Sequence, residues 1–196
     1  MTVNNVKRCA WPGNDPDFMI EYHDREWGVP LYDDNKLFEF LVLDAFQAGL
    51  SWRTVLAKRN NFARAFDKFD AKRIALYTKK DVTRLMRDPG IIRNRLKIEG
   101  TVKNAKAYLK TVEREGSFNA YVWRFVDGKP RVNKWKKISQ LPASTRESDA
   151  MSKDLKARGF TFVGSTICYA FMQAAGMVND HTVDCFRYKE VQNLIN

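Results

Sequence analysis

The chain has 196 residues, 44% of them hydrophobic and 13% aromatic, and carries a formal net charge of +11. This composition excludes a disordered chain and predicts one packed domain spanning residues 1–196. The positive charge favours a polyanionic partner, because lysines and arginines that meet phosphates release condensed counterions. Many basic proteins never bind nucleic acid, so charge alone leaves both possibilities open.

No apolar stretch is long enough to cross a bilayer, and the first residues, MTVNNVKRCAWPGND, lack the apolar region of a secretory signal. Three cysteines, an odd number, argue against a disulfide framework. We therefore expect a cytoplasmic protein without a membrane partner, whose thiols stay reduced and free to bind metal.

Apolar residues at helical spacing predict an all-α fold. The first clear helix lies in DDNKLFEFLVLDAFQAGLSW, with Asp33 or Asp34 as its N-cap and Gly49 at its end. A long helix is predicted from Ile98 until Gly116 ends it. Between these two, a shorter helix carries Val82, Leu85 and Met86.

In the last third of the chain, STRE (residues 144–147) fits a capping box, ahead of a helix that Gly159 would end. The last helix is predicted to run from about Thr166 to Ala175. Strand-like alternation is confined to YVWRFV (residues 121–126) and FTFV (residues 160–163).

Each end of the chain holds one cysteine and one histidine: Cys9 with His23, and His181 with Cys185. Thiolate and imidazole are typical zinc ligands, and residues four apart can reach one ion. A site using all four residues requires the two ends to meet. The spacing is not a standard zinc-finger signature, so the alternative is buried free cysteines and unrelated histidines. Cys168 lies on an apolar helix face and is expected in the core.

The segment RLMRDPGIIRNRLKI (residues 84–98) reads as two helices joined by a tight turn at Pro89 and Gly90. Such a hairpin presents backbone N–H groups and a helix N-terminus to a phosphate, with Arg93 and Lys97 among the cations beside it. The alternative is an ordinary helix–turn–helix with a solvated basic face.

A third cluster combines aromatic residues with a carboxylate, Asp44, which falls among apolar residues of a predicted helix. A buried carboxylate requires a partner or a function, and aromatic faces around it suit a flat cationic ligand. The alternative is that the aromatic residues build the core and Asp44 faces solvent. The other members of the cluster are Trp11, Tyr22, Trp27, Gln47, Leu50 and Trp52.

The segments CAWPGNDPDFMIEYHDREWGVP, LFEFLVLDAFQAGLSWRTVL, GIIRNRLKI and GFTFVGSTICYAFMQAAGMVNDHTVDC resemble the DNA-3-methyladenine glycosylase I family, in order, from about Arg8 to Cys185. The resemblance implies a fold of the helix–hairpin–helix glycosylase superfamily and a structural Zn²⁺ held by Cys9, His23, His181 and Cys185. It also implies a monofunctional enzyme, expected as a monomer, that hydrolyses the N-glycosidic bond of 3-methyladenine in alkylated duplex DNA and leaves an abasic site.

By resemblance, the base is flipped out of the helix onto Tyr22 and Trp52, with Trp11 and Trp27 as pocket walls and Asp44 as the catalytic carboxylate. Leu50, with Gln47 nearby, would fill the gap in the duplex. The remaining DNA contacts implied are Gly90, Ile91, Arg93, Ser152 and Lys153.

The chain departs from the family pattern at two places. Asp44 stands where the best known members have glutamate, and Phe18 or Met19 stands nearest to an expected pocket tyrosine. These departures leave open a non-catalytic binder of damaged DNA. A bifunctional lyase using Lys97 or Lys103 in a Schiff base is a further alternative. No aspartate lies between Pro89 and Val126, which fits an enzyme confined to labile bases.

Overall fold

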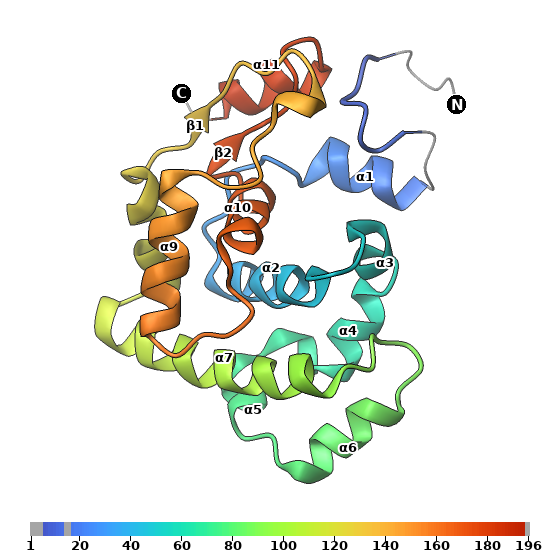
Figure 1. The fold of residues 1–196 in the computed structure, drawn as a ribbon, viewed down its shortest axis with the longest axis vertical. Coiled ribbons are helices and arrows are strands. Elements are labelled where there is room, and N and C mark those ends of the chain that lie inside the picture. The colour runs from blue at the N-terminus through green and yellow to red at the C-terminus, as the bar shows by residue number, and fades with distance from the viewer. Residues whose placement is uncertain (1–5, 14–16, 195–196) are drawn as a thin grey trace.

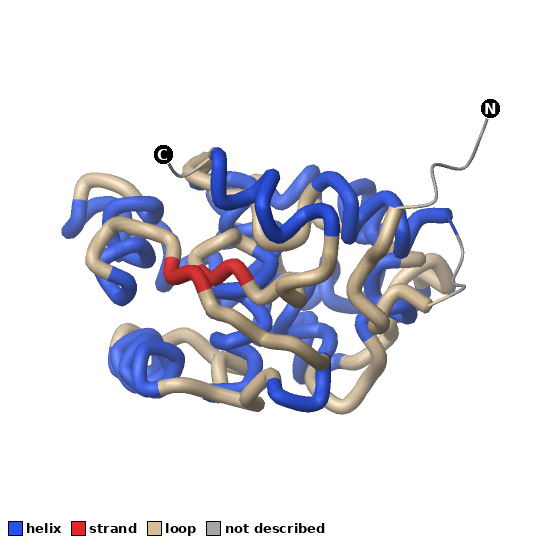
Figure 2. The backbone as a smooth tube through the Cα atoms, turned by 90° about the horizontal axis from the view of Figure 1, so that it is seen from above, coloured by secondary structure: helices blue, strands red, loops and turns tan. Residues whose placement is uncertain are grey.

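The computed structural model describes residues 6–13 and 17–194, and helices dominate them (Figure 1). Among these residues no helix is long and apolar enough to cross a membrane. Figure 2 shows how little of the described chain is strand. The α-helices are α1 (Asp17–Arg25), α2 (Asp34–Gln47), α3 (Trp52–Leu56), α4 (Arg59–Ala65), α5 (Ala71–Ala75), α6 (Lys79–Arg87), α7 (Arg95–Glu115), α8 (Phe118–Trp123), α9 (Arg146–Ala157), α10 (Ser165–Ala174) and α11 (Phe186–Asn193).

The helix α2 is the centre of the fold. Asp33 is its N-cap, accepting a hydrogen bond from the backbone N–H of Lys36 at 2.8 Å. Every residue from Leu37 to Phe46 is buried, and the helix packs against α3, α7, α8 and α10. A helix that is mostly apolar on all sides is stable only when it is surrounded in this way. The charged residues Glu39 and Asp44 are therefore exceptions inside the core.

The long helix α7 follows the prediction at its end and starts three residues before Ile98. Asn94 caps it by accepting from the Lys97 N–H at 3.1 Å, and Gly116 ends it with a φ of 85°. Its neighbour α6 begins with a capping box formed by Thr78 and Asp81. Residues 88–94 connect α6 to α7, as the sequence predicted.

The strand-like alternation at residues 121–126 does not lead to a strand, because this segment lies in α8 and a 3-10 turn, Arg124–Val126. Its buried residues Phe118, Tyr121 and Val122 also recur at helical spacing, and Ser117 caps the helix by accepting from Ala120 N–H at 3.0 Å. The other segment with strand-like alternation, residues 160–163, forms no strand either. Its backbone is irregular, and Asn104 on α7 accepts the N–H of Thr161 at 2.7 Å.

The capping box of α9 lies one residue later than predicted. Thr145, not Ser144, is the N-cap, and Ser148 takes the reciprocal position predicted for Glu147. Glu147 instead forms an ion pair with Arg131 at 2.8 Å.

The predicted last helix corresponds to α10, which another helix, α11, follows. Between them, β2 (Val178–Asn179) pairs in parallel with β1 (Arg131–Val132). A two-residue strand is too short to give an alternating pattern, so the sequence did not reveal it. A further 3-10 turn, Ile138–Gln140, lies between β1 and α9.

The N-terminal segment at Lys7 lies against the start of α11. The backbone N–H of Phe186 donates to the carbonyl of Lys7 at 2.8 Å, and Lys7 forms an ion pair with Asp184 at 2.6 Å. The end of α10 also approaches residues 28–31 closely. A Cβ atom on Gly176 would lie 2.2 Å from the Val29 carbonyl carbon, so only glycine fits this contact. Both approaches bring the N-terminal aromatic segment against the C-terminal helices.

Candidate metal centre and aromatic pocket

A pocket of about 210 Å³ opens between the N-terminal segment, α1, α2 and α10. Its lining is mainly aromatic and apolar with a few polar groups, the usual composition of a small-molecule site. Five of the aromatic and acidic residues singled out in the sequence meet in it, together with Gln47. The described residues that line it are Trp11, Tyr22, Trp27, Asp44, Gln47, Trp52, Ile138, Leu141, Ala170 and Gln173.

Asp44 is the acidic group of the pocket. It is 2% exposed, and its Oδ2 has no hydrogen-bond partner among the described residues. Burial raises the pKa of this carboxyl well above its usual value, because desolvation penalises the charged form. A buried polar atom without a partner is costly, and helix α2 holds this one at the wall of a pocket. The arrangement provides a hydrogen-bonding or charge-pairing group for a ligand.

The aromatic residues surround the carboxyl at angled orientations. The rings of Tyr22 and Trp52 lie 5.2 Å apart between centroids at 49°, and those of Trp11 and Trp27 lie 5.1 Å apart at 69°. The indole N–H groups of Trp11 and Trp52 are buried and unpaired among the described residues. Burial, and then the charge of Asp44, raise the pKa of Tyr22, so its ring stays neutral. The faces of such rings attract a flat cation.

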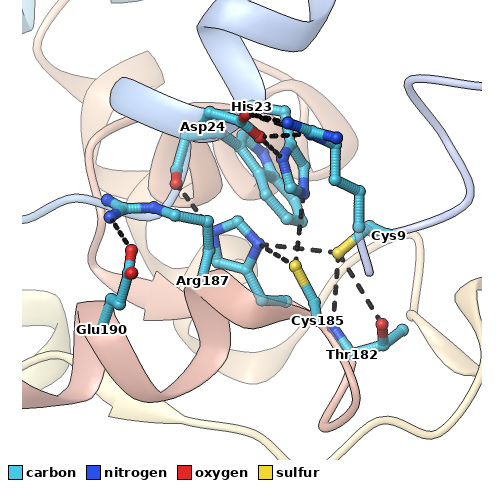
Figure 3. Close-up of polar contacts among 10 residues, drawn as sticks. Cys9, His23, Asp24, Thr182, Cys185, Arg187 and Glu190 are labelled. Carbon is cyan, nitrogen blue, oxygen red and sulfur yellow. Dashed lines mark hydrogen bonds and ion pairs between the residues drawn. The ribbon is translucent and has the colours of Figure 1, made fainter. Parts of the chain in front are cut away.

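Beside this pocket, the four predicted metal ligands come together from both ends of the chain (Figure 3). All four are buried, and their ligand atoms lie within 4.8 Å of one another. The Sγ of Cys185 lies 3.6 Å from His23 Nε2 and 3.6 Å from His181 Nδ1, and Cys9 Sγ lies 3.5 Å from His181 Nδ1. A buried group of two thiols and two imidazoles could hold a metal ion.

The second nitrogen of each histidine is held by another group. His23 Nδ1 lies 2.7 Å from the carboxylate of Asp24, and His181 Nε2 lies 3.0 Å from the carbonyl oxygen of Trp27. These contacts leave His23 Nε2 and His181 Nδ1 free to face the thiols, the pattern usual for metal-bound histidines. Trp27 lines the pocket, so the metal centre and the pocket share a wall.

Asp24 is held in turn by Arg8, whose guanidinium donates to both carboxylate oxygens at 2.7–3.0 Å. Burial acts to raise the pKa of Asp24, but hydrogen bonds from Arg8 and His23 outweigh it and keep this pKa below its usual value. The charged carboxylate therefore fixes the His23 ring.

The thiols of Cys9 and Cys185 shift each other's pKa in opposite directions. The hydrogen bond between them lowers the pKa of Cys185 and raises the pKa of Cys9, whose burial raises it further. Backbone N–H of Thr182 also donates to Cys9 Sγ at 3.4 Å. The lowered pKa of Cys185 favours its thiolate, the form that binds metal.

The predicted DNA contacts at residues 88–94 form a tight turn. The Gly90 N–H donates to Asp88 Oδ1 at 2.7 Å, and the Gly90 carbonyl accepts from Asn61 at 3.1 Å. Ile91 is buried beneath the turn, whereas Arg93 is exposed. The structure therefore provides a rigid turn with an exposed cation next to the start of α7.

The other predicted residues are placed in different ways. Leu50 is 42% exposed at the end of α2. Met19 belongs to the core, and Phe18 lines a separate cavity, so neither is among the described residues lining the pocket. Ser152 is buried and donates to the Val163 carbonyl at 2.6 Å, which turns its hydroxyl inward, whereas Lys153 is exposed.

Four lining residues were missed by the sequence analysis: Ile138, Leu141, Ala170 and Gln173. The first two lie in a 3-10 turn and directly after it, in a segment without any periodic signal. Gln173, however, is a polar residue inside the apolar run FMQAAGM, and this exception could have marked it.

The chain belongs to the methyladenine glycosylase family, whose model matches residues 11–188. Among individual proteins, it is 51% identical over 183 residues to DNA-3-methyladenine glycosylase 1 of Escherichia coli K12, covering 93% of this chain and 97% of that protein. It is also 49% identical over 178 residues to DNA-3-methyladenine glycosylase of Haemophilus influenzae, covering 91% and 96%.

Solved structures agree with this assignment. A crystal structure of 3-methyladenine DNA glycosylase I, 51% identical, superposes with a TM-score of 0.89 over 92% of this chain and 98% of that chain. The Staphylococcus aureus enzyme, solved to explain its recognition of 3-methyladenine, is 38% identical and gives 0.89 over 92% and 96%. The all-α prediction is confirmed as a mostly helical fold that also contains a two-stranded pair, and the family resemblance is confirmed.

Proposed function

We propose that the protein is a monofunctional DNA glycosylase that removes 3-methyladenine from alkylated duplex DNA by hydrolysing the N-glycosidic bond. The relatives that carry this name cover nearly the whole chain. The observation that carries the proposal is the unpartnered, buried carboxyl of Asp44 at the wall of an aromatic pocket.

The chemistry of the lesion suits this pocket. Methylation at N3 places positive charge on adenine, which makes the base a good leaving group. The base must leave the stack to reach the pocket, where Tyr22 and Trp52 stack on it and Trp11 and Trp27 form the walls. Aromatic faces stabilise the cation, and Asp44 pairs with it, so its carboxyl ionises when the positive base arrives. Binding that selects the labile base then supplies most of the discrimination.

DNA is held on both sides of the pocket in this proposal. Exposed Leu50 fills the gap left by the flipped base, with Gln47 beside it. The α6–turn–α7 unit acts as a helix–hairpin–helix, in which the turn at Gly90 meets the backbone and Arg93 pairs with a phosphate. Lys153 supplies a further phosphate contact from α9. The inward hydroxyl of Ser152 is left out of this set.

We also propose that the metal is a structural Zn²⁺. With Zn–S and Zn–N bonds of about 2.3 and 2.05 Å, tetrahedral geometry separates sulfur from nitrogen by about 3.6 Å. The three sulfur–nitrogen distances here, 3.5, 3.6 and 3.6 Å, fit this value. Four protein ligands leave no position for a water molecule, so the ion would fasten the chain ends and stabilise the pocket wall at Trp27. The protein would act as a single-domain monomer.

The lyase alternative has little support from the position of Lys97. This residue is buried and its ammonium donates to the carbonyls of Phe46 and Ala48 at 2.8 and 2.5 Å, at the end of α2. It is not among the described residues that line the pocket. Lys97 therefore supports the turn that carries Gln47 and Leu50 and does not attack a sugar.

The test is single-turnover release of 3-methyladenine from methylated duplex DNA. We expect release by the wild type and a reduction of about 10- to 100-fold in Asp44→Asn, the value of a hydrogen bond to a charged group. Asp149→Asn, the same change at an exposed position on α9, serves as the control. Tight binding to lesion-containing duplex with no free base would instead identify a non-catalytic binder.

A further inference from the structure

Gln173 is the polar lining residue to which neither the sequence nor the family assignment gives a role. It lies on α10, half-buried within a run of buried residues from Phe171 to Ala175, and it lines the aromatic pocket opposite α2. A glutamine amide offers both a donor and an acceptor, and its orientation decides which of the two a ligand meets.

The orientation of this amide is set by Asp180. The Gln173 Nε2 donates to Asp180 Oδ2 at 2.8 Å, and Asp180 is 1% exposed. Asp180 also accepts from the Trp135 indole at 2.7 Å, from Tyr169 at 2.6 Å and from Asn133 at 2.7 Å. An indole N–H can only donate, and four donors on two oxygens satisfy a carboxylate completely. The amide nitrogen of Gln173 is therefore the atom that must face Asp180.

The carbonyl oxygen of Gln173 is the polar atom that remains. It accepts no hydrogen bond from the described residues and is not among their buried unpaired atoms, so it is an accessible acceptor on a residue that lines the pocket. An acceptor fixed at the wall of a purine-sized pocket distinguishes ring substituents by whether they can donate a hydrogen bond. The amino group at C6 of adenine is a donor, whereas a 6-oxo group is an acceptor.

We propose that Gln173 determines specificity by accepting a hydrogen bond from the exocyclic amine of the flipped base, with Asp180 as its positioning residue. This inference rests on the proposed function, since it requires a purine in the aromatic pocket. It explains why a fully satisfied carboxylate lies behind the pocket. A 6-oxo purine would place two acceptors against each other, and a site built for a donor rejects such a base.

The experiment measures binding of two free bases, 3-methyladenine and 3-methylhypoxanthine, by quenching of tryptophan fluorescence. The wild type should prefer the 6-amino base. Gln173→Met removes the acceptor at nearly constant volume and should narrow this preference about tenfold, the value of one hydrogen bond. Gln192→Met, the same change on α11 outside the pocket, should leave it intact.

Asp180→Asn gives a second, independent readout. An asparagine amide can donate to the Gln173 carbonyl, which would turn the amide over and present its N–H₂ to the pocket. The preference should then shift toward the 6-oxo base, a change that simple loss of stability does not produce. An unchanged ratio of affinities in Gln173→Met overturns the inference even if Asp180→Asn fails to fold. Wild-type protein that binds neither base contradicts the proposed function itself.

Discussion

Removing the proposed zinc ion should cost the protein a large share of its stability. In the folded chain the proposed ion would link Cys9 to Cys185 and so enclose a loop of 177 residues (185 − 9 + 1). Closing a loop of this length removes chain entropy from the unfolded state worth about 5 kcal/mol in the cross-link model. Small domains have total stabilities of about 5–15 kcal/mol, so metal-free protein should be close to unfolding.

The assay is urea unfolding of protein with its metal, after treatment with a chelator, and of Cys9→Ser. We expect the chelator to lower the unfolding midpoint of the wild type strongly and to have no further effect on Cys9→Ser. Cys168→Ala controls for loss of a buried thiol, because Cys168 lies in the core away from the centre and should keep its metal. Wild-type protein that is fully folded without metal, with an unmoved midpoint, would refute the reasoning.

Three further predictions follow from single contacts. Asp24→Asn should weaken metal affinity about 10- to 100-fold, because the charged partner of His23 is lost. The affinity is measured by competition with a coloured chelator. An unchanged affinity would show that Asp24 does not help His23 to bind the metal. Gly176→Ala should lower the free energy of unfolding, measured with urea, by more than about 3 kcal/mol, since its Cβ would meet Val29 at 2.2 Å. Gly116→Ala, at a position with a positive φ but open space, should lower it by only about 1 kcal/mol. Equal losses in the two variants would contradict the packing argument. Folding raises the pKa of Asp44, so the folded state holds this proton more tightly than the unfolded chain. The protein therefore loses stability as pH rises above the carboxyl pKa of the unfolded chain, near 4, by up to about 1.4 kcal/mol per pH unit. Asp44→Asn should therefore gain stability relative to wild type as pH increases from 4 to 8, and parallel pH curves would disprove a buried, unpaired acid.

The sequence predicts well those elements whose local signals agree. Helix α2 has both an N-cap, Asp33, and apolar residues on every turn, and α7 has a glycine at the position that needs a positive φ. The apolar residues at 121–126 satisfy the strand and the helix spacing equally, so local pattern left this segment undecided and contact with the rest of the fold determines that it is helical. Ser144 and Thr145 are equally good caps, so a shift of one residue could not be resolved locally.

The candidate site was predictable as a set of residues but not as a geometry. The four metal ligands stood out because cysteine and histidine are so few in this chain. Their approach depends on long-range contacts, such as the hydrogen bond between Lys7 and Phe186, which no local pattern encodes. The same limit applies to Gln173. Its donor and acceptor are assigned only by Asp180, Trp135 and Tyr169, which the fold assembles from separate segments.

The most direct test of the central claim, that the aromatic pocket accepts a cationic alkylated purine, is to identify what the protein removes from DNA. Alkylated genomic DNA is incubated with the purified protein, and the released bases are analysed by mass spectrometry. The proposed function predicts 3-methyladenine as the main product. Release of no base, or of uncharged bases alone, would contradict it.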